Sequence, residues 1–325
     1  MTPIPRPSLI AGRRTTASLG KAEKLRFIAE KVIGLPTLPT VVSKIMELVD
    51  NPRTSARSLA SLIQSDQVLT AKILKLANSV YYGRQRQVGT VDEAIVVMGF
   101  EAVKDMGLSV SVLEAFKSPG ENRYFDLTLF WEHAISVGVG TQMLCRTYQP
   151  RYTTESFTAG LLHDLGKVVI NQYCHDDFLE IMDRVHLDDE DLLSAETTVL
   201  ATTHDRIGGW LANKWNLPLP IVEAIEFHHQ PYLAEKHRPL AALVHLSDYL
   251  GRIGRVGISG NKKDPVLTDD DRAYYAPLNI PMDEPGLASL LERFFLHMEQ
   301  ATTFIDVIQN RDDGDNFQAQ ESGFG

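Results

Sequence analysis

The sequence predicts an all-α protein, and two observations carry that prediction. Apolar residues recur at spacings of three and four along most of the chain, as they do on the buried face of a helix. No segment shows the apolar–polar alternation that is typical of a half-exposed strand, and no repeat of about 20 to 50 residues occurs. The expected architecture is a multi-helix bundle preceded by a smaller helical subdomain.

The chain begins with a segment that predicts no fold. Residues 1–24 mix Pro, Arg, Thr and Ser without an apolar period, and Arg and Lys outnumber Glu there. We expect a flexible basic arm, with a docking peptide for an acidic partner as the alternative.

Residues 25–120 predict an N-terminal subdomain of five short helices. Their ends are marked by residues that cap or break helices. The first helix lies between Pro39 and Asn51-Pro52, and the second includes the apolar residues Leu59, Leu62 and Ile63. The third lies between Asp66 and Tyr81-Tyr82-Gly83, with Val68 and Leu69 on its buried stripe. The fourth starts at the capping box of Thr90 and Glu93 and ends at Gly99, and the fifth runs from Ala102 to Phe116, before the turn Ser118-Pro119-Gly120.

Residues 121–255 predict a second bundle, and its polar side chains are distributed over several helices. The first expected helix starts at Thr128 and carries His133. The second carries His163, Asp164 and Lys167, with His163 and Lys167 on one face, four residues apart. The later helices run through Phe178 to Val185, follow the acidic run Asp188 to Asp191, start at Thr202 or Thr203 and carry His204, start at Pro220 and carry His228 and His229, and span Leu240 to Leu250 with His245 and Asp248.

Residues 256–325 predict a less regular end. Four glycines between 251 and 270 indicate a mobile loop, and one helix or a pair of helices is expected from Pro285 to Ile308. The acidic, Gln-rich end from Asp312 to Gly325 predicts disorder.

Imidazole and carboxylate side chains recur within the second bundle. A single His on an apolar helix is more often a packed side chain than a ligand, but several buried rings without partners would cost about 1–3 kcal/mol each. A shared metal removes that cost, and imidazole and carboxylate are ligands of zinc, manganese and iron. The candidate metal ligands are His133, His163, Asp164, His204, His228, His229 and Asp248, and we expect His245 to pack rather than to ligate.

These residues carry a family resemblance. Residues 160–167 (GLLHDLGK) resemble the HD motif of metal-dependent phosphohydrolases. The stretches 35–39 (LPTLP), 69–79 (LTAKILKLANS), 215–218 (WNLP) and 227–231 (FHHQP) resemble the HDOD family, the HD-related output domains of bacteria. The resemblance covers about residues 25 to 250. HDOD domains have usually lost some or all HD ligands, whereas this chain keeps the whole series.

The resemblance implies roles for the site residues. Asp164 would bridge two ions, with His133, His163 and Asp248 on one and His204, His228 and His229 on the other, and Lys167 would hold a phosphate oxygen. Asp164 and Lys167 are the candidate catalytic residues, and the expected cofactor is one or two divalent ions of Mn, Fe or Zn. The Gly-Tyr-Pro motif of the HD-GYP phosphodiesterases is missing, because Gln230-Pro231-Tyr232 follows the His pair.

Charge and cysteine content limit the expected partners and the expected cellular location. The chain has 32 Lys and Arg against 42 Asp and Glu, a net charge of −10, which argues against a nucleic-acid partner. Cys145 and Cys174 lack a metal or redox spacing, and no apolar run resembles a leader or a membrane span. We expect a cytoplasmic protein without a membrane partner.

Two functions compete on this sequence. The first is a bacterial signal-transduction protein that binds metal at an HD-type site and acts mainly through contacts with a protein partner. The alternative is an active metal-dependent phosphohydrolase or phosphodiesterase on a nucleotide or cyclic dinucleotide, supported by the intact ligand set and Lys167.

Overall fold

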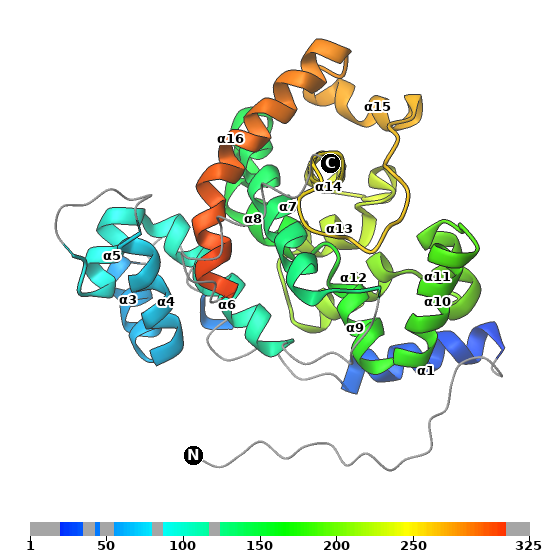
Figure 1. Cartoon of the computed structure of the whole chain (residues 1–325), viewed down its shortest axis with the longest axis horizontal. Coiled ribbons are helices and arrows are strands. Elements are labelled where there is room, and N and C mark those ends of the chain that lie inside the picture. The colour runs from blue at the N-terminus through cyan, green and yellow to red at the C-terminus, as the bar shows by residue number, and fades with distance from the viewer. Residues whose placement is uncertain (1–19, 35–42, 46–54, 80–86, 117–123, 310–325) are drawn as a thin grey trace, which may run out of the picture.

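The computed structural model describes residues 20–34, 43–45, 55–79, 87–116 and 124–309, most of which lie in helices (Figure 1). No strand occurs in these ranges, so the predicted all-α class is confirmed. Most of the helix expected after Pro39, and the breaks expected at residues 81–83 and 118–120, lie outside the described residues.

Four helices of the N-terminal part follow the predicted order: α3 (Ala56–Gln64), α4 (Gln67–Ala77), α5 (Val91–Met98) and α6 (Phe100–Ala115). Asp66 caps α4 by accepting a hydrogen bond from Leu69 N, as predicted. Thr90 caps α5 similarly, but the Glu93 carboxylate accepts from Gly89 N rather than closing the box at Thr90. Val68 is 53% exposed, so its predicted place on the buried stripe of α4 is wrong.

The helix α1 (Lys21–Gly34) was not predicted, and the arm predicted for residues 1–24 ends inside it. Ile28 and Val32 are its buried residues. They face the second bundle, because α1 packs against α11 and α12. Lys24 Nζ also donates to Val199 O at 2.6 Å.

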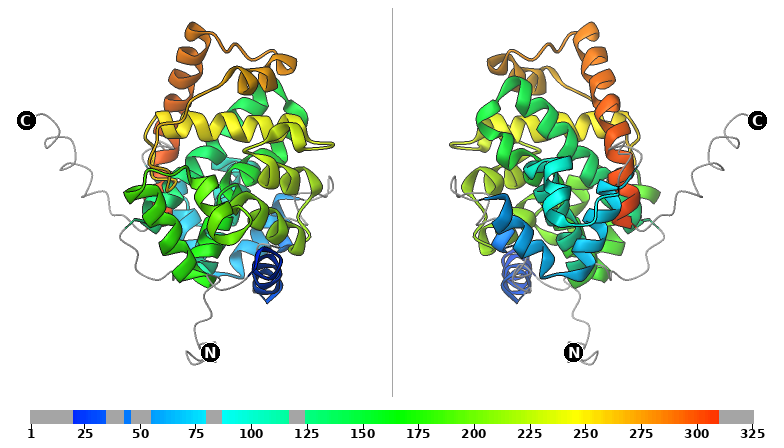
Figure 2. Two further views of the ribbon diagram at one scale, coloured as in Figure 1. Left: turned by 90° about the vertical axis from the view of Figure 1, so that its right-hand side faces the viewer. Right: turned by 90° about the vertical axis from the view of Figure 1, so that its left-hand side faces the viewer.

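The second bundle is built around α7, a helix of 22 residues that packs against α8, α14 and α16 (Figures 1 and 2). A second layer pairs α12 with α9 and α13. The helices are α7 (Leu127–Tyr148), α8 (Thr153–Leu162), α9 (Leu165–Tyr173), α10 (His175–Leu187), α11 (Leu192–Leu200), α12 (His204–Lys214), α13 (Leu219–Phe227) and α14 (Arg238–Ile253), with 3-10 turns η3 (Pro150–Tyr152) and η4 (Pro231–Leu233).

The C-terminal part returns to the N-terminal part. After α15 (Asp269–Tyr275) and η5 (Ala276–Leu278), the long α16 (Glu284–Gln309) packs on α7 and also on α4 and α6 (Figure 1). This helix agrees with the one predicted from Pro285 to Ile308, whereas α15 was not predicted. The described part of the chain contains no helix long and apolar enough to span a membrane.

The loop expected to be mobile is held against the bundle. We call residues 254–268 the roof loop. Ile258 N donates to Leu129 O of α7 at 3.0 Å, and Ser259 O accepts from Lys167 at 2.8 Å. Gly257 has φ +63°, and a Cβ there would lie 2.3 Å from Leu129 O. Only glycine allows so close an approach, and it brings the loop onto the predicted metal ligands.

Candidate metal centre

The structure brings all seven candidate ligands together, although they come from different elements. His133 lies within α7 and Asp248 within α14, while His204 is the first residue of α12. Their side chains are nearly inaccessible to solvent except for His229, which is half-buried.

The two doublets lie at helix ends rather than inside helices. α8 ends at Leu162 and α9 begins at Leu165, so His163 and Asp164 occupy the junction. The prediction that one helix carries His163, Asp164 and Lys167 is therefore wrong, although Lys167 does point into the site, where it donates to Asp164 Oδ2. His228 likewise follows the last residue of α13. Gly166 makes the junction possible, because a Cβ there would lie 1.9 Å from His204 O.

Three ligand-type atoms form one group, which we call the Asp248 group (His133, His163 and Asp248). His133 Nε2 lies 2.9 Å from Asp248 Oδ1, and His163 Nε2 lies 3.8 Å from the same oxygen. The ligand atoms of the group are all within 4.8 Å of one another, a separation that one ion could bridge.

A second group lies beside it, the Asp164 group (Asp164, His204, His228 and His229). Asp164 Oδ1 is 3.1 Å from His204 Nε2 and 3.7 Å from His228 Nε2, and His229 Nε2 is 2.9 Å from His204 Nε2. Asp164 Oδ2 is 3.4 Å from His163 Nε2, so this carboxylate joins the two groups.

Backbone carbonyls orient two of the imidazoles. His163 Nδ1 lies 2.7 Å from Gly160 O and His228 Nδ1 lies 2.8 Å from Ile225 O. A carbonyl only accepts, so each Nδ1 carries the hydrogen and, in the neutral ring, Nε2 presents a lone pair to the site. This is the arrangement by which outer partners orient metal-binding histidines.

Buried polar atoms that lack a hydrogen bond indicate whether a metal ion would fit this site. His163 Nε2, Asp164 Oδ1 and His228 Nε2 are buried without a hydrogen bond in the described structure. Leaving such atoms unpaired costs about 1–3 kcal/mol each. All three point into the same site, and a cation coordinated by a carboxylate and imidazole nitrogens would satisfy them together.

Charge within the site also suits a cation. Burial alone would raise the pKa of Asp164, but His163 and Lys167 lower it well below its usual range. Burial likewise opposes ionisation of Asp248, yet the hydrogen bond and charge of His133 hold its pKa well below the ordinary value. Both carboxylates are therefore anionic at neutral pH.

The imidazoles of the Asp164 group differ in charge. Burial and the neighbouring His163 lower the pKa of His228 to about 3. Burial and His228 also lower the pKa of His229 well below its usual value. Burial opposes the charge of His204, but Glu196 outweighs it and raises the pKa of His204 to about 9. His228 and His229 are thus neutral at pH 7, whereas His204 carries a proton that a metal would displace.

Lys167 reaches the site from α9. Its Nζ donates to Asp164 Oδ2 at 2.6 Å and to Ser259 O of the roof loop at 2.8 Å. An ammonium has three N–H donors, so one remains for a ligand. The structure therefore gives Lys167 a positioning role beside the phosphate contact expected from sequence.

His245 lies outside both groups of ligand-type atoms. Its Nδ1 donates to His228 O at 2.8 Å, and this hydrogen bond helps to hold the backbone of the His228-His229 doublet. This agrees with the prediction that His245 packs.

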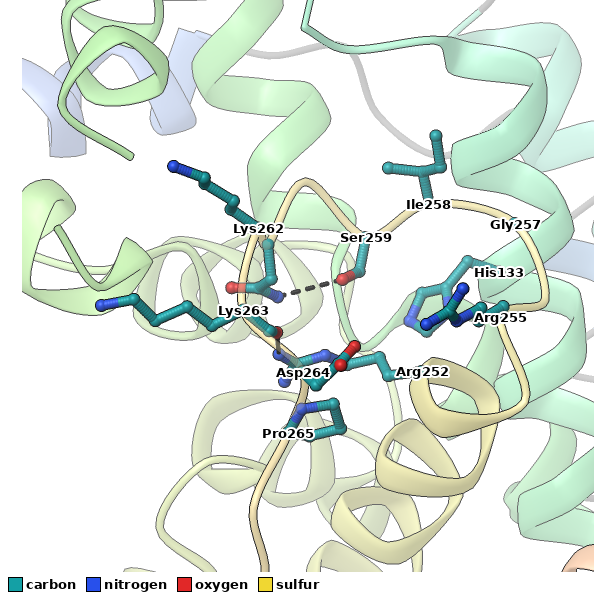
Figure 3. A pocket seen from close by; sticks show the side chains of 11 residues that line it. His133, Arg252, Arg255, Gly257, Ile258, Ser259, Lys262, Lys263, Asp264 and Pro265 are labelled. Atoms are coloured by element: carbon teal, nitrogen blue, oxygen red, sulfur yellow. Dashed lines mark hydrogen bonds between the residues drawn. The ribbon is translucent and has the colours of Figure 1, made fainter. Parts of the chain in front are cut away.

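Sequence reasoning missed two parts of the site. Glu196 of α11 is 1% exposed and accepts from both His204 N and His204 Nδ1. It does so where a Thr203 cap was expected, and Thr203 makes no side-chain capping bond. The second part is a pocket of about 130 Å³ beside His133, walled by the roof loop (Figure 3). A buried carboxylate eight residues before a His has no local signature, so sequence alone would not single it out.

Comparisons with known proteins bear on the family and the fold. The profile of the HDOD domain family matches residues 35–231. An uncharacterized protein from Treponema pallidum is 27% identical over 220 residues, which are 67% of this chain and 42% of that protein. This chain thus spans less than half the length of that relative.

Solved structures share the fold. An HDOD domain protein of unknown function from Geobacter sulfurreducens superposes with a TM-score of 0.68 at 23% identity, over 90% of this chain and 98% of that one. A proposed signal transduction protein from Marinobacter aquaeolei gives 0.74 at 21% identity, over 89% and 66%. A proposed phosphohydrolase from Shewanella amazonensis gives 0.66 at 24% identity, over 88% and 98%.

Proposed function

The chain belongs to the HDOD family, and we propose that it is a cytoplasmic bacterial signalling protein that binds divalent metal and acts mainly through contacts with a protein partner. The family assignment supports the signalling role, and the proposed signal transduction protein of the same fold from M. aquaeolei is in keeping with it. The missing Gly-Tyr-Pro motif argues against a cyclic dinucleotide phosphodiesterase, because the chain after the His pair forms the 3-10 turn η4 instead.

The observation that carries the metal proposal is the pair of ligand groups joined by Asp164. One ion would be held by the Asp248 group and a second by the imidazoles of the Asp164 group, with the Asp164 carboxylate between them. Three unpaired buried atoms lie where these ions would coordinate. When bound, divalent metal would lower the pKa of a coordinated water and neutralise phosphate charge.

Metal analysis of the protein purified without chelator tests the proposal. We expect one or two equivalents of Mn, Fe or Zn, and Asp164→Ala should lose most of that metal because it removes the bridging carboxylate. His245→Ala is the matched control, since it removes an imidazole next to the doublet that ligates nothing; its loss should be small. Protein without metal, and without thermal stabilisation by added Mn²⁺, Fe²⁺ or Zn²⁺, would contradict the proposal.

A working phosphohydrolase is the second candidate. The complete ligand set and the remaining N–H of Lys167 favour it, and the S. amazonensis protein of the same fold is a proposed phosphohydrolase. The two candidates separate in a turnover screen of nucleotides and phosphodiesters with metal-loaded protein. We expect no measurable hydrolysis of cyclic di-GMP; robust hydrolysis that Asp164→Ala abolishes would establish the enzyme instead.

A further inference from the structure

The pocket beside His133 is unusually basic for this chain. Four cationic side chains and one carboxylate line it: Arg252, Arg255, Lys262, Lys263 and Asp264 (Figure 3). The chain as a whole carries a net charge of −10, so this excess of cations runs against its composition. A concave site lined by one sign of charge concentrates ligands of the opposite sign.

Most of these cations already have acceptors. Lys262 and Lys263 pair with Asp189 at 3.2 and 3.3 Å, and in Figure 3 their ammonium ends extend away from His133. Arg252 donates to Lys263 O at 2.9 Å and lies 3.8 Å from Asp248 Oδ2. These contacts hold the roof loop in place.

Arg255 is different. Its side chain is exposed and has no hydrogen bond or ion pair with the described residues. Its backbone, with φ +53°, terminates α14: Arg255 N donates to Arg252 O at 3.1 Å and Val256 N donates to Gly251 O at 3.0 Å. The conformation places an unpaired guanidinium on the wall that His133 also lines.

The pocket therefore adjoins one half of the metal centre. His133 lines the pocket and also lies 2.9 Å from Asp248 Oδ1 within the Asp248 group. An anion held by Arg255 would lie next to that group. Guanidinium binds phosphate oxygens in a two-point fashion, and a phosphate monoester carries more negative charge than a carboxylate.

We propose that Arg255, supported by Arg252, forms a phosphoryl-binding subsite beside the Asp248 group. The subsite takes inorganic phosphate or the terminal phosphate of a nucleotide. The pocket volume of about 130 Å³ fits one phosphate group. The rest of a bound nucleotide would extend out of the open side of the pocket. The inference rests on the proposed metal centre for its biological meaning, but Arg255 binds the anion through its own charge.

The test is calorimetric titration of the purified full-length chain at constant ionic strength, with metal content measured on every sample. The probes are inorganic phosphate, guanosine 5′-monophosphate and acetate. Arg255→Asn removes the cation and suits the left-handed backbone, Arg255→Lys keeps the charge without the two-point contact, and Arg57→Gln removes an exposed charge from α3 as the control.

We expect Arg255→Asn to weaken phosphate binding about tenfold or more, Arg255→Lys to weaken it less, and Arg57→Gln to leave it unchanged. Metal content should match the wild type in all three. A nucleotide that binds more tightly than phosphate in the wild type identifies a nucleotide as the source. Equal phosphate affinity in Arg255→Asn, equal binding of acetate, or no binding of either phosphate probe would overturn the subsite.

The two proposals fail separately in this experiment. Normal metal content with unchanged phosphate binding in Arg255→Asn refutes the subsite alone. Wild-type protein without metal refutes the metal centre, and the comparison of Arg255→Asn with wild type then still decides whether Arg255 binds the anion.

Discussion

Glu196 contacts His204 directly but belongs to neither group of candidate ligands. It is buried and accepts from the backbone N and the Nδ1 of the same histidine, so it determines the direction of the ring and leaves Nε2 facing Asp164. Partners of this kind usually change metal affinity about 10- to 100-fold when they are replaced.

We expect Glu196→Gln to reduce metal affinity about tenfold, because the amide keeps a hydrogen bond but loses the charge that supports a coordinated imidazole. Competition with a chromogenic chelator measures the change. Glu223→Gln is the matched control: Glu223 is also buried and accepts from two backbone amides, Lys236 N and His237 N, but lies in neither ligand group. Equal losses in the two variants would show that Glu196 acts only through stability.

Metal binding should depend on pH through His204. Its pKa is raised to about 9, mainly because Glu196 offsets the effect of burial, so the ring is protonated at pH 7 and must lose that proton to coordinate. Affinity should therefore rise as pH increases towards 9 and fall as pH decreases. Calorimetry in buffers of different ionisation enthalpy should show about one proton released per binding event at pH 7. Binding without proton release would exclude His204 as a ligand.

The roof loop joins α14 to the rest of the site. It contributes the carbonyl that holds Lys167 and the cations of the pocket, and two of its glycines have left-handed backbones, Gly257 and Gly260. They differ in surroundings. A Cβ at Gly257 would lie 2.4 Å from His133 N, whereas at Gly260 the nearest atom is 3.8 Å away.

Substitution of these two glycines separates the cost of the backbone conformation from the cost of disturbing the contact between the roof loop and α7. Gly260→Ala should lower the free energy of unfolding by about 1 kcal/mol, the cost of the backbone conformation alone. Gly257→Ala should cost about 1–3 kcal/mol more, because the loop or α7 must move. Metal affinity should fall only in Gly257→Ala, since α7 carries His133. Denaturant unfolding and metal titration check both effects, and identical behaviour of the two variants would refute the close packing.

Both ends of the described chain pack on other parts of the fold. α1 lies on α11 and α12, close to the elements that carry Glu196 and His204, and α16 spans α7, α4 and α6. Contacts of α1 and α16 therefore cross the predicted subdomain boundary at residue 120. The segments at the two ends stabilise the metal-site bundle from outside.

Truncation should reveal this dependence. Removal of residues 1–19 should leave the melting temperature unchanged, because the arm has no periodic apolar face. Removal of residues 1–34 should lower it by several degrees, since burial of Ile28 and Val32 contributes about 1.5–3 kcal/mol each. A large loss on the shorter truncation, or none on the longer one, would contradict the packing of α1.

Helices were predictable where a periodic apolar face coincided with a cap. The helix capped by Asp66 and the long α16 are examples, and both were found within a few residues of their expected ends. The helix break at His163 and Asp164 was not predictable, because the local pattern is helical on both sides. The close approach of Gly166 to His204 O, 38 residues later, accompanies that break.

Local periodicity was enough to predict the all-α class, and motifs in a characteristic order were enough to predict the HDOD family, because neither needs a three-dimensional contact. The seven candidate ligands and their assignment to two ions were expected from the resemblance to that family, and in the structure they lie in two groups. The contact of Glu196 with His204, the bond of Lys167 to the roof loop and the pocket that Arg255 lines beside His133 became visible only in the folded chain. Those contacts join segments far apart in the chain, so they depend on how the helices pack.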